Sequence, residues 1–253
     1  MGEVIAIANQ KGGVAKTTTA VNLSAGLATL GKKVLLLDLD PQGNASSGLG
    51  VDKDKLDHCI YDVLINDAPI KSVLLPTEIP GLDLVPATIQ LAGAEIELVT
   101  VISRESKMKK ALVQIKEEYD YIFFDCPPSL GLLTLNALTA ADSLIIPIQC
   151  EYYALEGLGQ LMNTITLVQK HLNSSLAVKG VVLTMFDART NLSIQVVEEV
   201  KEYFKGKVYG SIIPRNVRLS EAPSHGQPIF LYDPKSKGAE TYLDLAREVM
   251  DSE

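Results

Sequence analysis

Short runs of consecutive apolar residues recur along this chain, and most of them end in a polar turn followed by a stretch with helical spacing. The clearest runs lie at residues 4–8, 34–38, 121–125, 143–148 and 177–185. Unbroken apolar runs of this length are typical of strands that a parallel sheet buries on both faces. We expect further strands at residues 82–86 and 208–213, and an edge strand at residues 73–77.

The segments between these strands predict helices. The first follows a glycine-rich turn and runs to about Leu30, where Gly31 provides a natural stop. Apolar positions with helical spacing predict further helices at residues 60–64, 92–98, 104–118, 132–140, 155–172, 193–204 and 242–250. Because strand and helix alternate without an internal repeat, the sequence predicts an α/β fold. We expect one domain over residues 1–253, with a twisted, mostly parallel sheet and helices on both faces.

Composition narrows the class of protein. The chain has 253 residues, of which 47% are hydrophobic, so a substantial core is expected. Three cysteines, Cys59, Cys126 and Cys150, have neither disulfide nor zinc spacing. The first residues resemble no signal peptide, and no apolar run approaches the ~18 residues that a membrane span needs. These features predict a cytoplasmic protein without a transmembrane segment.

The charges are unevenly placed along the chain. The net charge of −8 argues against indiscriminate binding to nucleic acid. Residues 179–247, however, hold ten Lys/Arg against eight Asp/Glu. Two interpretations of this last third stay open, a local basic patch and an ordinary surface of mixed charge.

The main chemical signal is the loop N-Q-K-G-G-V-A-K-T-T-T at residues 9–19, between the first strand and the first helix. The backbone N–H groups of such a loop, together with a helix N-terminus, form a cradle for phosphate. Lys16 is expected to reach the terminal phosphates, and Thr17 to offer its hydroxyl to Mg²⁺. The usual P-loop pattern is not met, because Gln10 and Ala15 stand where its two glycines belong.

Carboxylates close two of the predicted buried strands. Asp125 ends the run at 121–125, where a carboxylate holds Mg²⁺ directly or through water. Asp38 and Asp40 lie in the polar turn after the run at 34–38. Ligands of doubly wound sheets bind at the carboxyl ends of strands, so all three are candidates for the site.

The glycine loop resembles the deviant Walker A motif K-G-G-x-x-K-[ST] of the ParA/MinD family of P-loop ATPases. D-P-Q-G-N at 40–44, D-C-P-P-S at 125–129, Q-C-E-Y-Y-A-L-E-G at 149–157 and P-R-N-V-R-L-S-E-A-P-S-H-G at 214–226 look like the chromosomal ParA, or Soj, branch. The similarity extends from Val4 to Ala246. It implies a Mg²⁺-dependent ATPase with slow intrinsic turnover. D-C-P-P-S matches the family's switch II, a loop that senses the γ-phosphate of ATP.

The resemblance also implies roles for single residues. Lys11 is similar to the family's signature lysine, which reaches the phosphates of the partner's nucleotide across a dimer interface. Asp40 is the better candidate to orient the attacking water, and Lys11, Lys16 and Asp40 form the predicted catalytic set. Metal contacts are expected from Thr17, Asp125 and Asp40. Nucleotide contacts are expected from Lys11, Gly12, Gly13, Val14, Ala15, Lys16, Thr17, Thr18, and, beside the adenine, Pro214 and Asn216, with Thr184–Asp187 opposite.

One residue of the loop departs from the family pattern. Relatives usually have glycine at the position of Ala15, directly before the second lysine. We expect a negative φ at Ala15, as at the start of a helix, because alanine is then tolerated without strain.

The same resemblance implies partners. Arg189 and Arg218 stand where chromosomal ParA proteins carry arginines that bind double-stranded DNA without sequence preference. Lys201, Lys205, Lys207, Lys235 and Lys237 either extend this patch or are ordinary surface charges. The resemblance further implies an ATP-dependent homodimer and a ParB-type centromere-binding protein that stimulates hydrolysis. The protein is therefore expected to associate with the nucleoid.

Two other functions remain as alternatives at this point. One is a nucleotide-switched regulator of replication initiation that acts by contact with a protein such as the replication initiator. The other is a membrane-associated, MinD-like positioning ATPase. MinD-like proteins end in a basic amphipathic helix, whereas residues 242–253 here end in acidic residues that anionic lipid would repel. The sequence therefore predicts no membrane partner.

Overall fold

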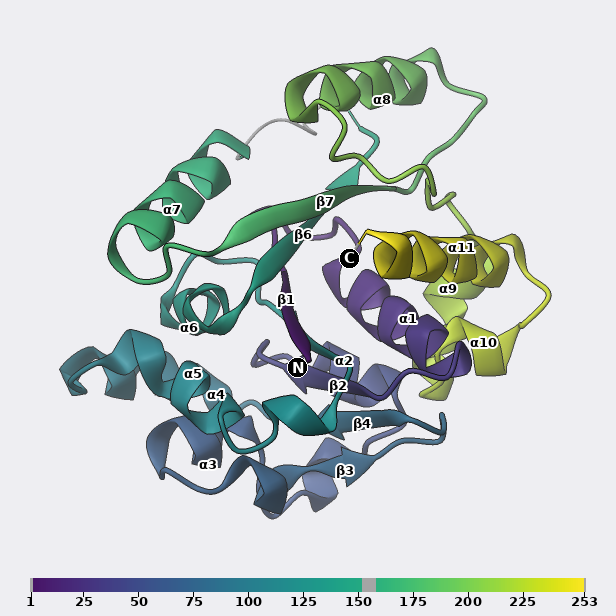
Figure 1. Cartoon of the computed structure of the whole chain (residues 1–253). Helices are drawn as coiled ribbons and strands as arrows, with labels where there is room; N and C mark the ends of the chain where they lie inside the picture. Colours follow the sequence, from purple (N-terminus) through teal and green to yellow (C-terminus); the bar gives the residue numbers. More distant parts are fainter. Residues whose placement is uncertain (1, 152–157, 253) are drawn as a thin grey trace.

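The computed structural model describes residues 2–151 and 158–252, and a seven-stranded sheet lies at its centre (Figure 1). The strand order is β3-β4-β2-β5-β1-β6-β7. Every neighbouring pair is parallel except β3 and β4 at one edge. The strands are β1 (Glu3–Ile7), β2 (Val34–Asp38), β3 (Leu75–Pro76), β4 (Leu82–Val85), β5 (Tyr121–Asp125), β6 (Ser143–Gln149) and β7 (Ala177–Thr184).

Helices connect these strands and cover both faces of the sheet, as Figure 1 shows. The α-helices are α1 (Lys16–Thr29), α2 (Asn44–Gly48), α3 (Ile60–Ile65), α4 (Leu91–Glu97), α5 (Lys107–Leu112), α6 (Leu132–Ala140), α7 (Leu158–His171), α8 (Asn191–Phe204), α9 (Val217–Glu221), α10 (Ile229–Tyr232) and α11 (Lys237–Asp251). The 3₁₀-helices are η1 (Lys53–Lys55), η2 (Ile70–Val73), η3 (Leu98–Thr100), η4 (Arg104–Ser106), η5 (Lys116–Glu118) and η6 (Ala222–His225).

The core consists of two apolar layers, one on each face of the sheet. Successive side chains of a strand point to opposite faces, so Val4 and Ala6 lie in one layer, and Ile5 and Ile7 in the other. Helices α3 to α8 cover the first layer, and α1, α2, α9, α10 and α11 cover the second. The predicted α/β fold, with a mostly parallel sheet between two helical layers, is confirmed.

The register of the sheet assembles the candidate site. β1 lies between β5 and β6, so the glycine loop leaves from the middle of the sheet. Asp38 at the end of β2 is the register partner of Asp125 at the end of β5. The two carboxylates and the loop therefore meet at the carboxyl edge, although they are far apart in sequence.

The predicted strand at residues 208–213 is wrong. Only isolated bridges form there, between Val181 and Val208 and between Phe186 and Pro214. The Glu248 carboxylate of α11 accepts hydrogen bonds from the backbone N–H groups of Gly210 at 2.6 Å and Ser211 at 2.7 Å. The N–H groups of Tyr209 and Ile213 still donate to the carbonyls of Val181 and Leu183 in β7. The N–H of Ser211, between them, is taken by the Glu248 side chain, so the ladder with β7 is interrupted.

The single helix predicted at 104–118 is also wrong, since the segment folds as η4, α5 and η5. The apolar pattern was sound, because Met108, Leu112 and Ile115 are all buried in one layer. The Asn136 side chain accepts from the N–H of Met108 and donates to the carbonyl of Arg104, which fixes a break before α5.

Other boundaries differ by a few residues. β3 begins at Leu75, and α11 begins at Lys237 because Ser236 caps it by accepting from the N–H of Ala239. Residues 155–157 of the predicted helix at 155–172 lie outside the described residues. Within residues 2–151 and 158–252, no helix combines the length and apolar character needed to cross a membrane.

Candidate functional site

The glycine loop is anchored by β6, which lies beside β1, and by β7, the next strand of the sheet. The Asn9 side chain donates to the carbonyl of Pro147 in β6 at 2.7 Å and accepts from the N–H of Lys11 at 3.0 Å. At the far end of the loop, the Thr184 hydroxyl of β7 donates to the carbonyl of Val14 at 3.2 Å. The sheet thus fixes both ends of the loop before α1 begins.

The expected negative φ at Ala15 is wrong. Ala15 is the N-cap of α1 in the left-handed region, with φ of 64° and ψ of 34°, and Gly13 also has a positive φ of 73°. The chain must turn between Val14, which Thr184 holds, and the first turn of α1. Left-handed conformations at Gly13 and Ala15 make that turn, and at Ala15 the Cβ atom makes it unfavourable.

Lys16 is nearly buried at the mouth of the loop. Its side-chain nitrogen donates to the carbonyl of Lys11 at 2.9 Å, so its charge is held across the loop. Burial lowers the pKa of Lys16, and the nearby carboxylates of Asp125 and Asp40 oppose this shift. The lysine is thus placed among acidic groups at the carboxyl edge of the sheet.

Asp125 carries the strongest signal for a bound cation. The residue is fully buried, and neither carboxylate oxygen makes a hydrogen bond of normal geometry within the described residues. The Thr17 hydroxyl lies close enough to favour the charged form, but burial and the neighbouring Asp38 raise the pKa well above its ordinary value. A buried carboxylate without hydrogen bonds is costly, and a cation would offset that cost.

The side chains around Asp125 are too few to hold a metal ion by themselves, but they suit Mg²⁺ that is also bound by substrate phosphates. No group of three or more His, Cys, Asp or Glu side chains that could hold a metal occurs in the described part of the chain. Mg²⁺ typically binds one or two carboxylates and completes its octahedral shell with water and substrate phosphates. Asp125 and Thr17, beside a phosphate-binding loop, fit that pattern.

Asp38 and Asp40 differ in their surroundings. Asp38 is fully buried and accepts from the N–H and hydroxyl of Ser46, at 2.8 and 2.7 Å, and from the N–H of Asp40. Burial raises the pKa of Asp38 to about 6, and the bonds from Ser46 partly oppose this. Asp40 accepts from the N–H of Gln42 through Oδ1 at 2.9 Å. Asp38 therefore anchors the turn to α2. Within the described residues, the Oδ2 atom of Asp40 accepts no hydrogen bond from the turn.

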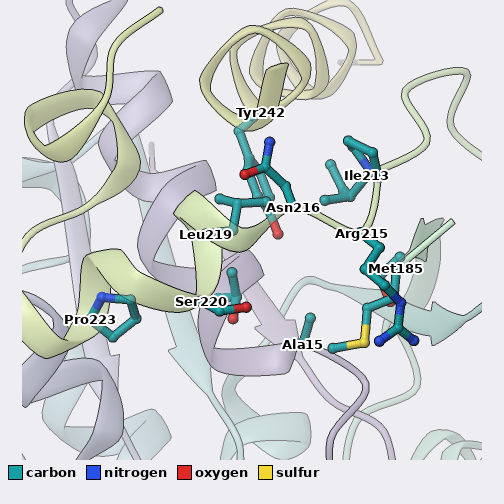
Figure 2. Close-up of a pocket in the computed structure, with 12 residues that line it drawn as sticks. Ala15, Met185, Ile213, Arg215, Asn216, Leu219, Ser220, Pro223 and Tyr242 are labelled. Atoms are coloured by element: carbon teal, nitrogen blue, oxygen red, sulfur yellow. The ribbon is translucent and has the colours of Figure 1, made fainter. Parts of the chain in front are cut away.

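A cavity of about 250 Å³ opens beside the loop (Figure 2). Pro214 and Asn216, predicted beside the adenine, lie in its lining with Thr184 and Met185 from the opposite wall. The two walls are joined because Arg215 donates its N–H to the carbonyl of Phe186 at 3.0 Å. Asn216 uses Oδ1 to cap α9, accepting from the N–H of Arg218, so its amide NH₂ group is the part left for a ligand.

The comparisons with known proteins agree with this geometry. A family profile described as an AAA domain matches residues 2–178. The chain is 68% identical to the sporulation initiation inhibitor protein Soj of Bacillus subtilis, with 98% of each chain covered. It is 60% identical to the chromosome partitioning protein ParA of Myxococcus xanthus, with 99% of this chain and 88% of that protein covered. The chain belongs to the ParA/Soj family of P-loop ATPases.

A solved structure supports the same fold. The cobyrinic acid a,c-diamide synthase of Mycobacterium smegmatis, with bound ADP and magnesium, is 42% identical with a TM-score of 0.87. The match covers 99% of this chain and 94% of that one. The P-loop fold expected from the ParA/Soj resemblance is therefore confirmed.

The two arginines that the ParA/Soj resemblance implies for DNA are exposed and paired with acids. Arg189 donates to both carboxylate oxygens of Asp187, at 2.8 and 2.6 Å, and this pairing holds the pKa of Asp187 well below its usual range. Arg218 pairs with Glu221 at 2.9 Å and with Asp233 at 3.4 Å. Exposed pairs of this kind contribute little to stability.

Several residues that line the cavity beside the glycine loop were not predicted from the sequence. Leu219, Ser220 and Pro223 line it from α9 and η6, and Tyr242 reaches it from α11, with its hydroxyl 3.2 Å from that of Thr19. Arg215 was also missed, and its guanidinium donates to Glu151. The Ala-Pro stretch at 222–223 marked the segment, but no local signal shows that Tyr242 comes back to the loop. The motif at 149–157 lies outside the described residues from position 152 onward.

Replacing Ala15 with glycine should stabilise the protein. Glycine adopts the left-handed conformation without the Cβ penalty, so we expect Ala15→Gly to raise the free energy of unfolding by about 1 kcal/mol in urea denaturation. Ala28→Gly, a control in the last turn of α1, should lower it by about 1 kcal/mol. Equal destabilisation by both changes would contradict the strained conformation of Ala15.

Replacing Asp125 with asparagine tests the metal site. We expect Asp125→Asn to lower the Mg²⁺-dependent gain in nucleotide affinity at least tenfold, because the variant lacks the carboxylate expected to hold the metal. Titration of a fluorescent ATP analogue with Mg²⁺ or with EDTA measures this gain. Affinity in EDTA serves as the internal control and should stay within about twofold of wild type. An unchanged Mg²⁺ gain would remove Asp125 from the site.

Proposed function

We propose that this protein is a chromosome-partitioning ATPase that binds ATP with Mg²⁺, dimerises, and binds DNA in the ATP state. The observation that carries this proposal is the buried, unpartnered carboxylate of Asp125 beside Lys16 and Thr17 at the phosphate loop. The Bacillus and Myxococcus relatives, both at 60% identity or more, are named Soj or ParA. We therefore favour the partition role over the synthase name of the mycobacterial structure.

Hydrolysis is expected to depend on a small set of side chains at the carboxyl edge. When bound, Mg²⁺ would neutralise charge on the phosphates, held by Thr17 and Asp125. Lys16 is expected to stabilise the terminal phosphates. Asp40 is the carboxylate expected to orient water, because Asp38 is fully engaged by Ser46 and Asp40. The base is expected between Pro214 and Asn216 on one side and Met185 on the other.

A second copy of the chain is expected to dock on the face of the loop. Gly12 and Gly13 are both exposed, and a Cβ added at Gly12 would meet only Pro128, at 3.9 Å. The backbone is therefore open to close approach at this point. In the proposed dimer Lys11 would reach the phosphates of the other subunit, which makes assembly depend on ATP.

DNA binding is expected to follow from dimerisation. A dimer presents two copies of Arg189 and Arg218 and so roughly doubles the contacts with phosphate, which raises affinity steeply. A ParB-type protein would then release the dimer by stimulating hydrolysis, and the protein would cycle on and off the nucleoid. The alternative function is regulation of replication initiation, in which the same nucleotide switch would control contact with the replication initiator.

Replacing Asp40 with alanine separates binding from hydrolysis. We expect Asp40→Ala to reduce ATP turnover at least a hundredfold, while light scattering still shows dimers with ATP and monomers with ADP. The variant should also keep its ATP-dependent affinity for DNA. Normal turnover would exclude Asp40 from water activation, and monomers of the wild type with ATP would exclude the dimer.

Replacing Arg218 with alanine tests backbone recognition of DNA. We expect Arg218→Ala to weaken binding to unrelated duplexes equally, and to reduce the slope of log K against log salt by about 1 for each phosphate that the arginine neutralises. Arg247→Ala is a matched control, since Arg247 is similarly exposed and pairs with Asp244 at 2.9 Å. Weaker binding to some sequences alone, or an equal effect in the control, would contradict the assignment.

A further inference from the structure

We infer that Glu95 is a positioning residue for the switch II segment, defined here as residues 126–131. When ATP binding changes the conformation of this segment, the Glu95 carboxylate would accept hydrogen bonds from the backbone N–H groups in the first turn of α6. This inference rests on the proposed function, because the segment is expected to respond to the γ-phosphate. Nothing in the local sequence around Glu95 indicates this role.

The first observation is an unsatisfied acid. Glu95 lies on α4, and its Oε1 atom is buried with no hydrogen-bond partner within the described residues. A buried carboxylate oxygen without a donor is costly, so such groups usually find a partner in some state of the protein. Glu97 on the same helix differs, because it accepts from the Tyr61 hydroxyl at 2.9 Å.

The second observation is the space at Gly131. Its φ is −79°, a value that any residue adopts, so glycine is not required there by the backbone. A Cβ atom at this position would overlap Oε1 of Glu95 and would lie 3.2 Å from its Cδ atom. Gly131 therefore provides the room that the Glu95 carboxylate occupies at the end of the switch II segment.

The third observation is the start of α6. Gly131 is its N-cap and has no side chain, so no cap side chain accepts from the first-turn N–H groups. A carboxylate near the N-terminus of a helix is favourable, since the exposed N–H groups carry partial positive charge. Glu95 is the acid that stands at this position.

The switch II segment links Glu95 to the nucleotide loop. Near the middle of the segment, Pro128 is the side chain that a Cβ added at Gly12 would meet, at 3.9 Å. The next residue, Ser129, accepts a hydrogen bond at its carbonyl from the Thr134 hydroxyl of α6 at 2.6 Å. A movement of the segment toward bound ATP is thus transmitted to the first turn of α6. The first-turn N–H groups, which no side chain caps, can then donate to Oε1 of Glu95. This contact stabilises the ATP-bound arrangement without touching the nucleotide.

Kinetics provide the first test. We expect Glu95→Ala to lower kcat for ATP at least fivefold with KM within twofold, because binding relies on the glycine loop. Glu95→Gln keeps an acceptor oxygen and should recover most of the activity, and the control Glu97→Gln should match wild type. Turnover of Glu95→Ala within twofold of wild type, or no recovery by Glu95→Gln, would overturn the role.

A double-mutant cycle tests the contact itself. Gly131→Ala should lower kcat in the wild-type chain, where the new Cβ meets the Glu95 carboxylate. In the Glu95→Ala chain the same change should alter kcat by less than twofold, because the obstructing oxygen is gone. Equal reductions in both backgrounds would contradict the contact.

Hydrogen exchange separates this inference from the proposed function, because it does not require turnover. With Mg²⁺ and a non-hydrolysable ATP analogue, the amides of residues 132–134 should gain protection in the wild type and not in Glu95→Ala. Absence of ATP hydrolysis by the wild type would refute the proposed function while leaving this measurement valid. No gain of protection in the wild type on binding the analogue would overturn the role of Glu95.

Discussion

The site depends on one unfavourable arrangement. The Asp125 carboxylate is fully buried, and within the described residues neither of its oxygens makes a hydrogen bond of normal geometry. The sheet enforces it, because β5 pairs with both β1 and β2 and so delivers Asp125 between the glycine loop and Asp38. Burial and the neighbouring acids favour the neutral form, whereas Lys16 and Thr17 favour the charged one. We therefore expect a cation, bound together with nucleotide, to offset the cost of burying this carboxylate.

A second unfavourable feature lies in the loop itself. Ala15 adopts a left-handed conformation where glycine would be free of strain, and it does so because Thr184 and the first turn of α1 fix the chain on either side. Strained conformations persist where the surrounding structure determines them fully, and they gather at binding sites. The strain at Ala15 and the buried carboxylate of Asp125 both lie at the carboxyl edge of the sheet. Folding stability is therefore lowered at the same edge where nucleotide is expected to bind.

The contact between Glu95 and Gly131 extends the same principle beyond the nucleotide. Within the described residues, Oε1 of Glu95 has no hydrogen-bond partner, and it lies beside the start of α6, which has no capping side chain. Gly131, the N-cap of α6, ends the segment that begins after Asp125. Polar groups that lack a hydrogen bond in one conformation can form one in another. Such a bond favours the second conformation and shifts the equilibrium toward it. The bound nucleotide would then affect the contact between α4 and α6 as well as the conformation of the glycine loop.

The fold class, the order of most elements and the glycine loop could be predicted from the chain alone, because apolar runs and glycine punctuation are local signals. The same signals identified Lys16, Thr17 and Asp125 as candidate site residues. Three features could not be predicted in this way: the conformation of Ala15, the bond from Ser211 to Glu248 that interrupts the ladder at 208–213, and the approach of Tyr242 to the cavity. Each of these depends on contacts between residues distant in sequence, where packing and hydrogen bonding override local preference.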